Sequence, residues 1–114
     1  MASSVLQIGY YPTLLQTRQL MLEQNGYQVT SVLGNEQGMA VAPSQRFDVI
    51  VIGFSDTHAM RSGMVRWLKQ HLPETPVVAL LANTSETFTD ADCATLSEDP
   101  AVWLATVRRV CLKV

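Results

Sequence analysis

The stretch Phe47-Asp-Val-Ile-Val-Ile-Gly53 decides how this sequence is expected to fold. Its four consecutive β-branched residues favour a strand, and they leave no polar position that could face water. Strands buried on both faces are typical of parallel sheets that helices cover on each side. A second apolar run, Val77-Val-Ala-Leu-Leu-Ala82, follows after a helix-length segment. The two runs therefore predict neighbouring central strands of a parallel sheet.

The rest of the chain alternates strand-length and helix-length segments around these two runs. Because each parallel connection needs its own covering segment, this order predicts an α/β fold with helices on both faces of the sheet. The strand expected at 27–33, the second along the chain, is rich in β-branched residues and is expected near an edge of the sheet. Further strands are expected at 4–9, 27–33 and 93–96, and helices at 13–25, 35–41, 57–72 and from 100 onward.

Length and composition limit the function classes. At 114 residues, one domain over residues 1–114 is expected. The formal charge is −2 and the eight Lys and Arg residues are scattered, which does not favour a nucleic-acid partner. The longest apolar run is too short to cross a membrane, and no signal peptide is evident, so a cytoplasmic protein is expected. Cys93 and Cys111 lack metal-ligand spacing, and no metal or cofactor is expected.

Three phrases of the sequence carry a family resemblance: Leu22-Glu-Gln-Asn-Gly-Tyr-Gln-Val29, Phe47-Asp-Val-Ile-Val-Ile52 and Trp67-Leu-Lys-Gln-His-Leu-Pro-Glu-Thr-Pro-Val-Val78. They resemble the receiver domains of response regulators in two-component phosphorelay signalling. The resemblance covers nearly the whole chain, and it implies a flavodoxin-like (CheY-like) three-layer sandwich. The implied five-stranded parallel sheet has the strand order 2-1-3-4-5.

The residues that carry receiver chemistry are not found at their expected positions. Receivers accept a phosphoryl group on an aspartate after the third strand, beside Mg²⁺ held by acidic residues after the first strand. Gly53 stands at the acceptor position, and no acidic residue precedes Glu23. Leu81 or Ala82 replaces the hydroxyl residue after the fourth strand, and no lysine follows the fifth strand until Lys113. The resemblance therefore implies a pseudo-receiver that lacks the phosphorylation site.

The candidate pocket comprises Tyr10, Tyr11, Gly53 and Asp56, because α/β sheets bind ligands at the carboxyl ends of their strands. The favoured interpretation is that the tyrosines fill the former acidic site, with one ring buried against Gly53 or Phe54. A role for the rings in stacking on a small aromatic ligand stays open. Asp56 is read as a loop or helix-capping residue. No catalytic residue is assigned.

The segment 83–92 departs most from the family pattern. It is shorter than the segment in which receivers form their fourth helix, and it is rich in hydroxyl-bearing residues that form helices weakly. We therefore expect the fourth helix to be shortened or missing. Phe88, the only large apolar residue in this segment, is expected to point inward. We expect this remodelled side to belong to the surface that binds a partner.

These features favour a phosphorylation-independent, receiver-like signalling domain that binds another protein and is not an enzyme. The sequence leaves the partner, the pathway and the oligomeric state open. One alternative is a sensor that binds a small ligand in the emptied pocket. A second alternative is an atypical receiver that is phosphorylated at a displaced acceptor, Asp56.

Overall fold

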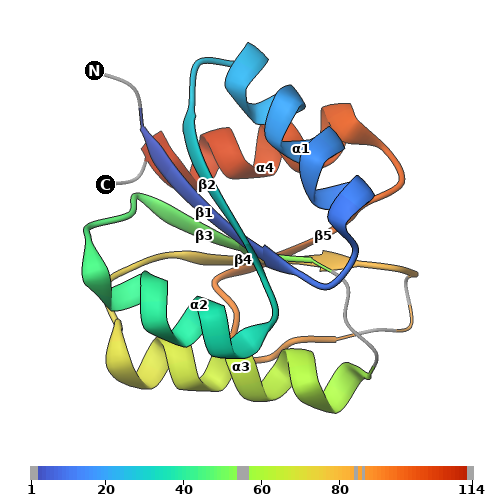
Figure 1. The fold of residues 1–114 in the computed structure, drawn as a ribbon. Helices are drawn as coiled ribbons and strands as arrows, with labels where there is room; N and C mark the ends of the chain where they lie inside the picture. The colour runs from blue at the N-terminus through green and yellow to red at the C-terminus, as the bar shows by residue number, and fades with distance from the viewer. Residues whose placement is uncertain (1–2, 54–56, 84, 86, 113–114) are drawn as a thin grey trace.

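A five-stranded parallel sheet forms the centre of the computed structural model, which describes residues 3–53, 57–83, 85 and 87–112 (Figure 1). The strand order is β2-β1-β3-β4-β5, so the predicted fold and the edge position of the second strand are confirmed. No helix in these described ranges is long and apolar enough to span a membrane. The strands are β1 (Ser4–Gly9), β2 (Gln28–Leu33), β3 (Val49–Ile52), β4 (Val77–Leu81) and β5 (Cys93–Leu96).

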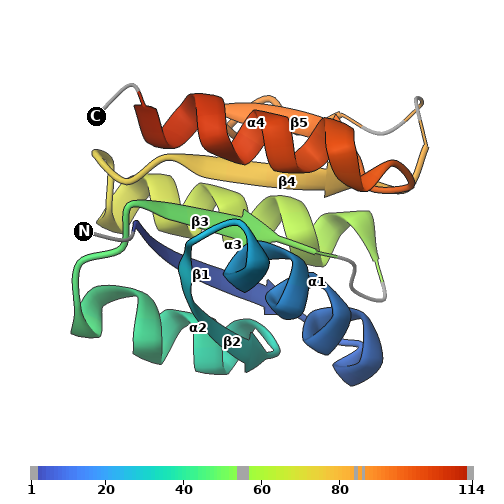
Figure 2. The ribbon, with the colours of Figure 1, turned by 90° about the horizontal axis from the view of Figure 1, so that it is seen from above.

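Helices cover both faces of the sheet (Figures 1 and 2). On one face lie α1 (Pro12–Gln24) and α4 (Pro100–Leu112). On the other face lie α2 (Asn35–Val41), the short 3₁₀ turn η1 (Ala42–Ser44) and α3 (His58–His71). This is the three-layer arrangement that the alternating sequence pattern predicts.

The sheet separates two apolar clusters, and β3 contributes to both of them. Ile50 and Ile52 pack with Met64 of α3, whereas Val49 and Val51 pack on the other face with Trp103 of α4. Successive side chains of a strand point to opposite faces, so a strand between two helical layers has no face that meets water. This explains why β3, the strand at the centre of the stretch that decides the fold, contains no polar residue.

Turns and helix ends follow the local signals in the sequence. Pro12 begins α1, where its missing N–H costs nothing. Gly26, which follows α1, has a φ of 91°, a left-handed conformation that glycine adopts without strain. At the start of α3 the Thr57 side chain accepts a hydrogen bond from the backbone N–H of Met60 at 3.1 Å. The Thr57 side chain therefore caps this helix.

The prediction of a shortened or missing fourth helix is not supported. Four α-helices are present in the described residues, at the four places where the sequence predicts helices, and the last of them, α4, is 13 residues long. It begins where Asp99 accepts a hydrogen bond from the backbone N–H of Ala101 at 3.0 Å, and it buries Trp103 against the sheet. A strong cap and a large apolar anchor stabilise this helix independently of the segment before β5.

The segment between β4 and β5 consists of turns, bends and irregular backbone in its described residues 82–83, 85 and 87–92. Phe88 is buried in the cluster under α2 and α3, so the prediction that it points inward is confirmed. The phenyl ring therefore anchors this polar segment to the core.

Candidate functional site

The strand ends meet at the carboxyl edge of the sheet, where the sequence placed the candidate pocket. The backbone N–H of Gly53 donates to the carbonyl oxygen of Ile8 at 2.8 Å, and that of Gly34 donates to Gly9 at 2.8 Å. These bonds continue the ladder to the last residues of β1, β2 and β3. Side chains that follow these strands, or reach them from α1, therefore share one small region.

Gly53 lies against the side chain of an arginine. A Cβ atom on residue 53 would lie 2.9 Å from Nη1 of Arg18, which is closer than real Cβ contacts come. The next neighbours are backbone atoms, the carbonyl oxygen of Ile8 at 3.4 Å and Cα of Gly9 at 4.0 Å. The guanidinium thus lies where a side chain on residue 53 would begin.

Arg18 reaches this place because it lies on the inner face of α1. Leu15, Arg18 and Leu22 are the buried residues of α1, and their spacing puts them on one side of a helix. The helix also comes close to β1 at Gly9, where a Cβ atom would lie only 3.2 Å from Cδ2 of Leu15. The helix packing therefore carries a charged side chain to the end of β3.

A second arginine is buried near the first. Arg61 of α3 is 4% exposed and Arg18 is 7% exposed. An Nη2–H of Arg61 donates to the carbonyl oxygen of Leu80, near the end of β4, and the guanidinium carbon lies 4.7 Å from the centroid of the Phe88 ring. This geometry adds a cation–π contact. Burial lowers the pKa of Arg18, and the positive charge of Arg61 lowers it further.

The tyrosines of the candidate pocket do not fill the space beside Gly53. Tyr11 is exposed, and Tyr10 packs instead over Gly34, with its hydroxyl accepting a hydrogen bond from the backbone N–H of Asn35 at 3.1 Å. The side chain that lies beside Gly53 is therefore Arg18 from α1 and not a tyrosine, so the prediction of a tyrosine packed against Gly53 is not supported. Phe54 and Asp56 lie outside the described residues, so the expectations for them stay predictions.

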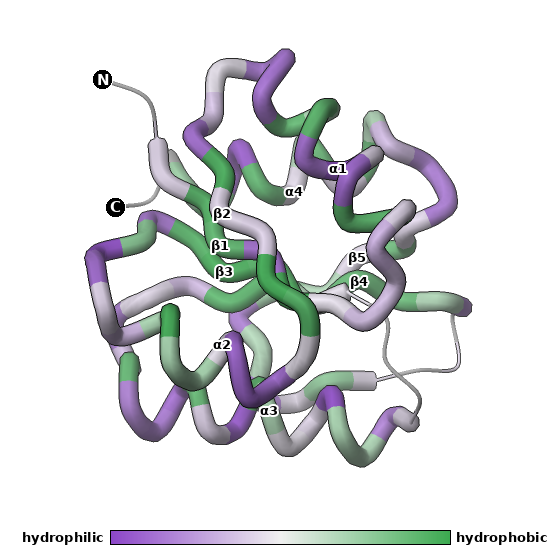
Figure 3. Tube along the Cα trace, viewed as in Figure 1, coloured by the Kyte–Doolittle hydropathy of each residue, from purple (hydrophilic) through white to green (hydrophobic). Residues whose placement is uncertain are grey.

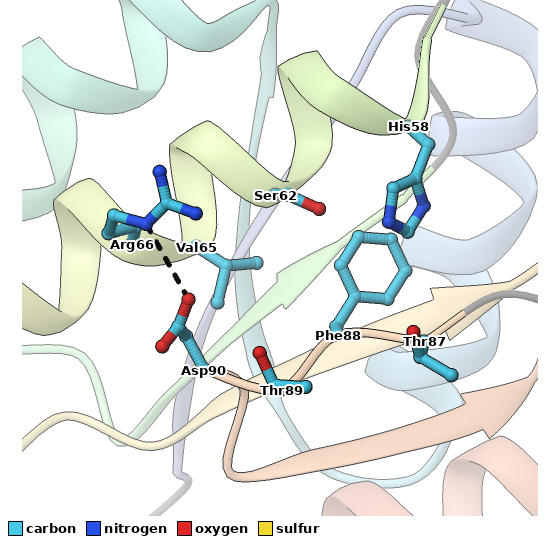
Figure 4. Close-up of a pocket in the computed structure, with 8 residues that line it drawn as sticks. All are labelled: His58, Ser62, Val65, Arg66, Thr87, Phe88, Thr89 and Asp90. Atoms are coloured by element: carbon cyan, nitrogen blue, oxygen red, sulfur yellow. Dashed lines mark ion pairs between the residues drawn. The ribbon is translucent and has the colours of Figure 1, made fainter.

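A hollow of about 170 Å³ lies next to Phe88, between α3 and the segment before β5 (Figure 4). At one end the His58 and Phe88 rings are 4.6 Å apart between centroids, and at the other Arg66 and Asp90 form an exposed ion pair of 3.7 Å. It opens outward and is lined mostly by polar side chains. The lining residues are His58, Ser62, Val65, Arg66, Thr87, Phe88, Thr89 and Asp90.

The described groups at the carboxyl edge do not fit the Mg²⁺ ion that receivers hold there. Mg²⁺ prefers carboxylate and other oxygen ligands, whereas in the described residues β1 ends at Gly9, β3 is followed by Gly53, and a guanidinium lies beside Gly53. In the described part of the chain, no three His, Cys, Asp or Glu side chains gather as a metal site would need. Asp92 instead accepts hydrogen bonds from Lys69 and from the backbone N–H of Val77.

Sequence reasoning placed Arg18 on the helix but gave neither arginine a role in the site. The signal was present in the helix pattern: Arg18 lies three residues after Leu15 and four before Leu22, within the apolar stripe of α1. Arg61 lies three residues before Met64 in the same way. A charged residue inside an apolar stripe must be buried with polar contacts, so it marks a candidate site.

Comparison with solved structures assigns the fold. CheY4 of Vibrio cholerae superposes with a TM-score of 0.83 at 22% identity, over 96% of this chain and 99% of that one. A receiver domain of a Syntrophus aciditrophicus histidine kinase gives 0.84 at 23% identity, over 99% and 92%. A chain in the complex of histidine kinase ThkA with response regulator TrrA gives 0.83 at 12% identity, over 95% and 97%.

These similarities show that the chain has the CheY-like fold of response regulator receiver domains. No family model and no curated protein sequence matches the chain. The similarity therefore lies in the arrangement of the backbone, and at sequence identities of 12–23% it shows a shared fold and nothing more.

Proposed function

We propose that this chain is a receiver-like signalling domain that works without phosphorylation, by binding another protein in a two-component-type system. The observation that carries the proposal is the position of Arg18, whose Nη1 lies 2.9 Å from where a Cβ on residue 53 would be. Residue 53 follows the third strand, where receivers have their acceptor aspartate. A glycine offers no nucleophile there, and the guanidinium takes the adjacent space.

The charge at this edge also opposes the chemistry of phosphoryl transfer. Phosphoryl transfer in receivers relies on Mg²⁺ to neutralise the charge that develops on the transferred group. Arg18 and Arg61 instead bring two buried positive charges to this region. At about 4 Å, like unit charges near a protein surface repel each other by on the order of 4 kcal/mol. A divalent cation is therefore strongly disfavoured, and we propose that the domain is not an enzyme.

We propose a protein partner because a solved structure with this fold is a complex with another protein. TrrA was solved in complex with the histidine kinase ThkA. For this chain we propose a cytoplasmic signalling protein as the partner. The small-ligand alternative has less support, because Arg18 occupies the space beside Gly53 that such a ligand would need.

Intact-protein mass spectrometry after treatment with acetyl phosphate and Mg²⁺ tests the chemical half of the proposal. We expect no stable phosphoryl adduct, while a receiver with an intact acidic site, treated in parallel, becomes labelled. The Asp56→Asn variant is the matched control for the remaining alternative. An adduct on the natural chain that disappears in this variant would establish Asp56 as a displaced acceptor and refute the proposal.

Partner capture under two conditions tests the binding half. The immobilised domain is exposed to extract from its own cells, with and without acetyl phosphate and Mg²⁺. We expect the same specific partner in equal amounts under both conditions, and its purified form should bind the domain directly. A partner that is retained only after acetyl phosphate treatment would show that binding depends on phosphorylation.

A further inference from the structure

Most of the exposed large apolar side chains of the described residues lie on or near α1 and the end of β2. Six such side chains are exposed in the described residues, and four of them lie on or next to α1 and at the end of β2. Leu20 is 54% exposed and Leu33 is 44% exposed. The other two of the four are Tyr11 and Leu14, and the two that lie elsewhere are Met60 and Val102.

The helix α1 carries apolar residues on its outer as well as its inner side. Leu15 and Leu22 are buried against the sheet, whereas Leu14 and Leu20 face outward. Apolar and polar residues alternate along this helix (Figure 3). A helix covered on one side only normally presents charged and polar residues to water. Among mostly polar residues, α1 therefore exposes two leucines that its packing against the sheet does not cover.

The outer surface of α1 is almost without charge. Of its exposed residues only Glu23 is charged, because Arg18 is buried. Charged residues are depleted at the centres of protein interfaces, where they would lose their hydration. The other exposed residues of α1 are Pro12, Thr13, Leu14, Gln16, Thr17, Leu20 and Gln24.

A groove of about 390 Å³ runs between α1 and the edge strand β2. Leu20 and Leu33 lie on its two sides. The backbone N–H of Leu33 already donates to Oε1 of Gln37 at 3.1 Å, so at this residue the strand edge is closed to a further strand. Contact here would use side chains. The groove is lined by Pro12, Gln16, Gln19, Leu20, Glu23 and Leu33.

We propose that α1 and β2 form the interface of a homodimer, in which Leu20 and Leu33 of each copy pack against the groove of the other. A two-fold interface must be complementary to itself. An almost neutral surface meets this condition, because no block of like charge opposes its own copy. The glutamine side chains add to it, since each amide both donates and accepts hydrogen bonds. A highly charged partner would leave its charges without counterparts on this surface.

This inference is independent of the proposed function. The dimer surface lies on the outer side of α1 and β2, whereas the arginines lie under α1 at the carboxyl edge. A monomeric chain would leave the phosphorylation-independent role untouched, and a phosphorylated chain would leave the dimer untouched. The two proposals can therefore fail separately.

Sedimentation velocity of the full chain over a concentration series tests the interface. We expect a reversible monomer–dimer equilibrium for the natural chain. Leu20→Lys and Leu33→Lys should each weaken dimerisation roughly tenfold or more, because each would place a charge in a desolvated contact. Val102→Lys is the matched control, since Val102 is 47% exposed on α4 and away from the groove.

Circular dichroism and thermal melting confirm that each variant is folded, as expected for changes at exposed positions. A natural chain that stays monomeric up to millimolar concentration would overturn the proposal. So would a dimer that both groove variants leave intact, or one that Val102→Lys weakens as much as Leu20→Lys does. A dimer weakened by the groove variants alone supports it.

Discussion

Charged side chains lie at both ends of the sheet, but their charge and their contacts differ between the two ends. At the amino end, the carboxylates of Asp48 and Asp92 each accept a hydrogen bond of 2.7 Å from a backbone N–H at the start of a strand, Ser4 and Val77 respectively. At the carboxyl end, the guanidinium of Arg18 is buried beside Gly53.

The comparison teaches that the two ends of one sheet carry opposite charges with different roles. Carboxylates at the amino end bind backbone N–H groups, whereas a guanidinium lies at the carboxyl end, where receivers have acidic residues. The acids at the amino end satisfy backbone groups that the strands leave unpaired. The buried cations at the carboxyl end stand where the receiver fold holds its acidic site, and one of them, Arg61, donates a hydrogen bond to the backbone carbonyl oxygen of Leu80. The carboxyl end is therefore where the described residues of this chain differ in charge from the acidic site that the receiver resemblance implies.

The largest expected effect concerns the aromatic ring that supports the carboxyl end. Phe88→Ala should destabilise the protein by about 3 kcal/mol, because the buried ring packs in the core and lies beside Arg61 and His58. Urea denaturation followed by circular dichroism measures the change. Val102→Ala, at an exposed position, should stay within about 0.5 kcal/mol of the natural chain. Equal losses for the two variants would contradict this account of the segment before β5.

A smaller effect is expected at the amino end. Asp92→Ala removes the acceptor of the Val77 N–H and of Lys69 Nζ, and it should cost about 1–2 kcal/mol. Asp90→Ala is the matched control, because its ion pair with Arg66 is exposed and such pairs contribute about 0–1 kcal/mol. The same urea titrations measure both. If Asp90→Ala cost more than Asp92→Ala, the structural role of the acids at this end would be misassigned.

The fold could be predicted from the sequence because its determinants are local and repeat along the chain. The apolar runs of β3 and β4, the proline at the start of α1 and the glycine after it each predicted their own element. The four helices of the described residues also lie where the sequence predicts them, and α4 depends on its own cap at Asp99 and its own anchor at Trp103. The expectation of a shortened or missing fourth helix came from the family pattern and is not supported.

The smallest expected effect tests the contact at Gly53 directly. Gly53→Ala should destabilise the protein by about 1 kcal/mol, because the new methyl group would displace the flexible end of Arg18. Gly63→Ala, in the exposed part of α3 with no atom within 4 Å, should instead stabilise it by about 0.5–1 kcal/mol. Thermal melts of the two variants should therefore shift in opposite directions. Shifts of the same sign would count against the close contact.

The candidate site was predicted in its location but not in its contents. The carboxyl ends of the strands and the glycine at position 53 were expected from the sequence. The tyrosines were assigned to the space beside Gly53, because they follow β1 directly and are large. The residue that lies there, Arg18, comes from the middle of α1, and only the packing of that helix on the sheet brings it to β3. Contacts between elements of this kind are not visible in local patterns.

Titration of the ¹⁵N-labelled protein with Mg²⁺, followed by NMR, tests the reversed charge at the carboxyl end most directly. The backbone amides of Gly9 and Gly53 and the side-chain Nε–H of Arg18 report on this edge. We predict no saturable shift of these three signals at millimolar Mg²⁺, while a receiver with an intact acidic site shifts in the same range. A saturable shift centred on Gly53 would contradict the account, because it would mean that a divalent cation binds beside Arg18.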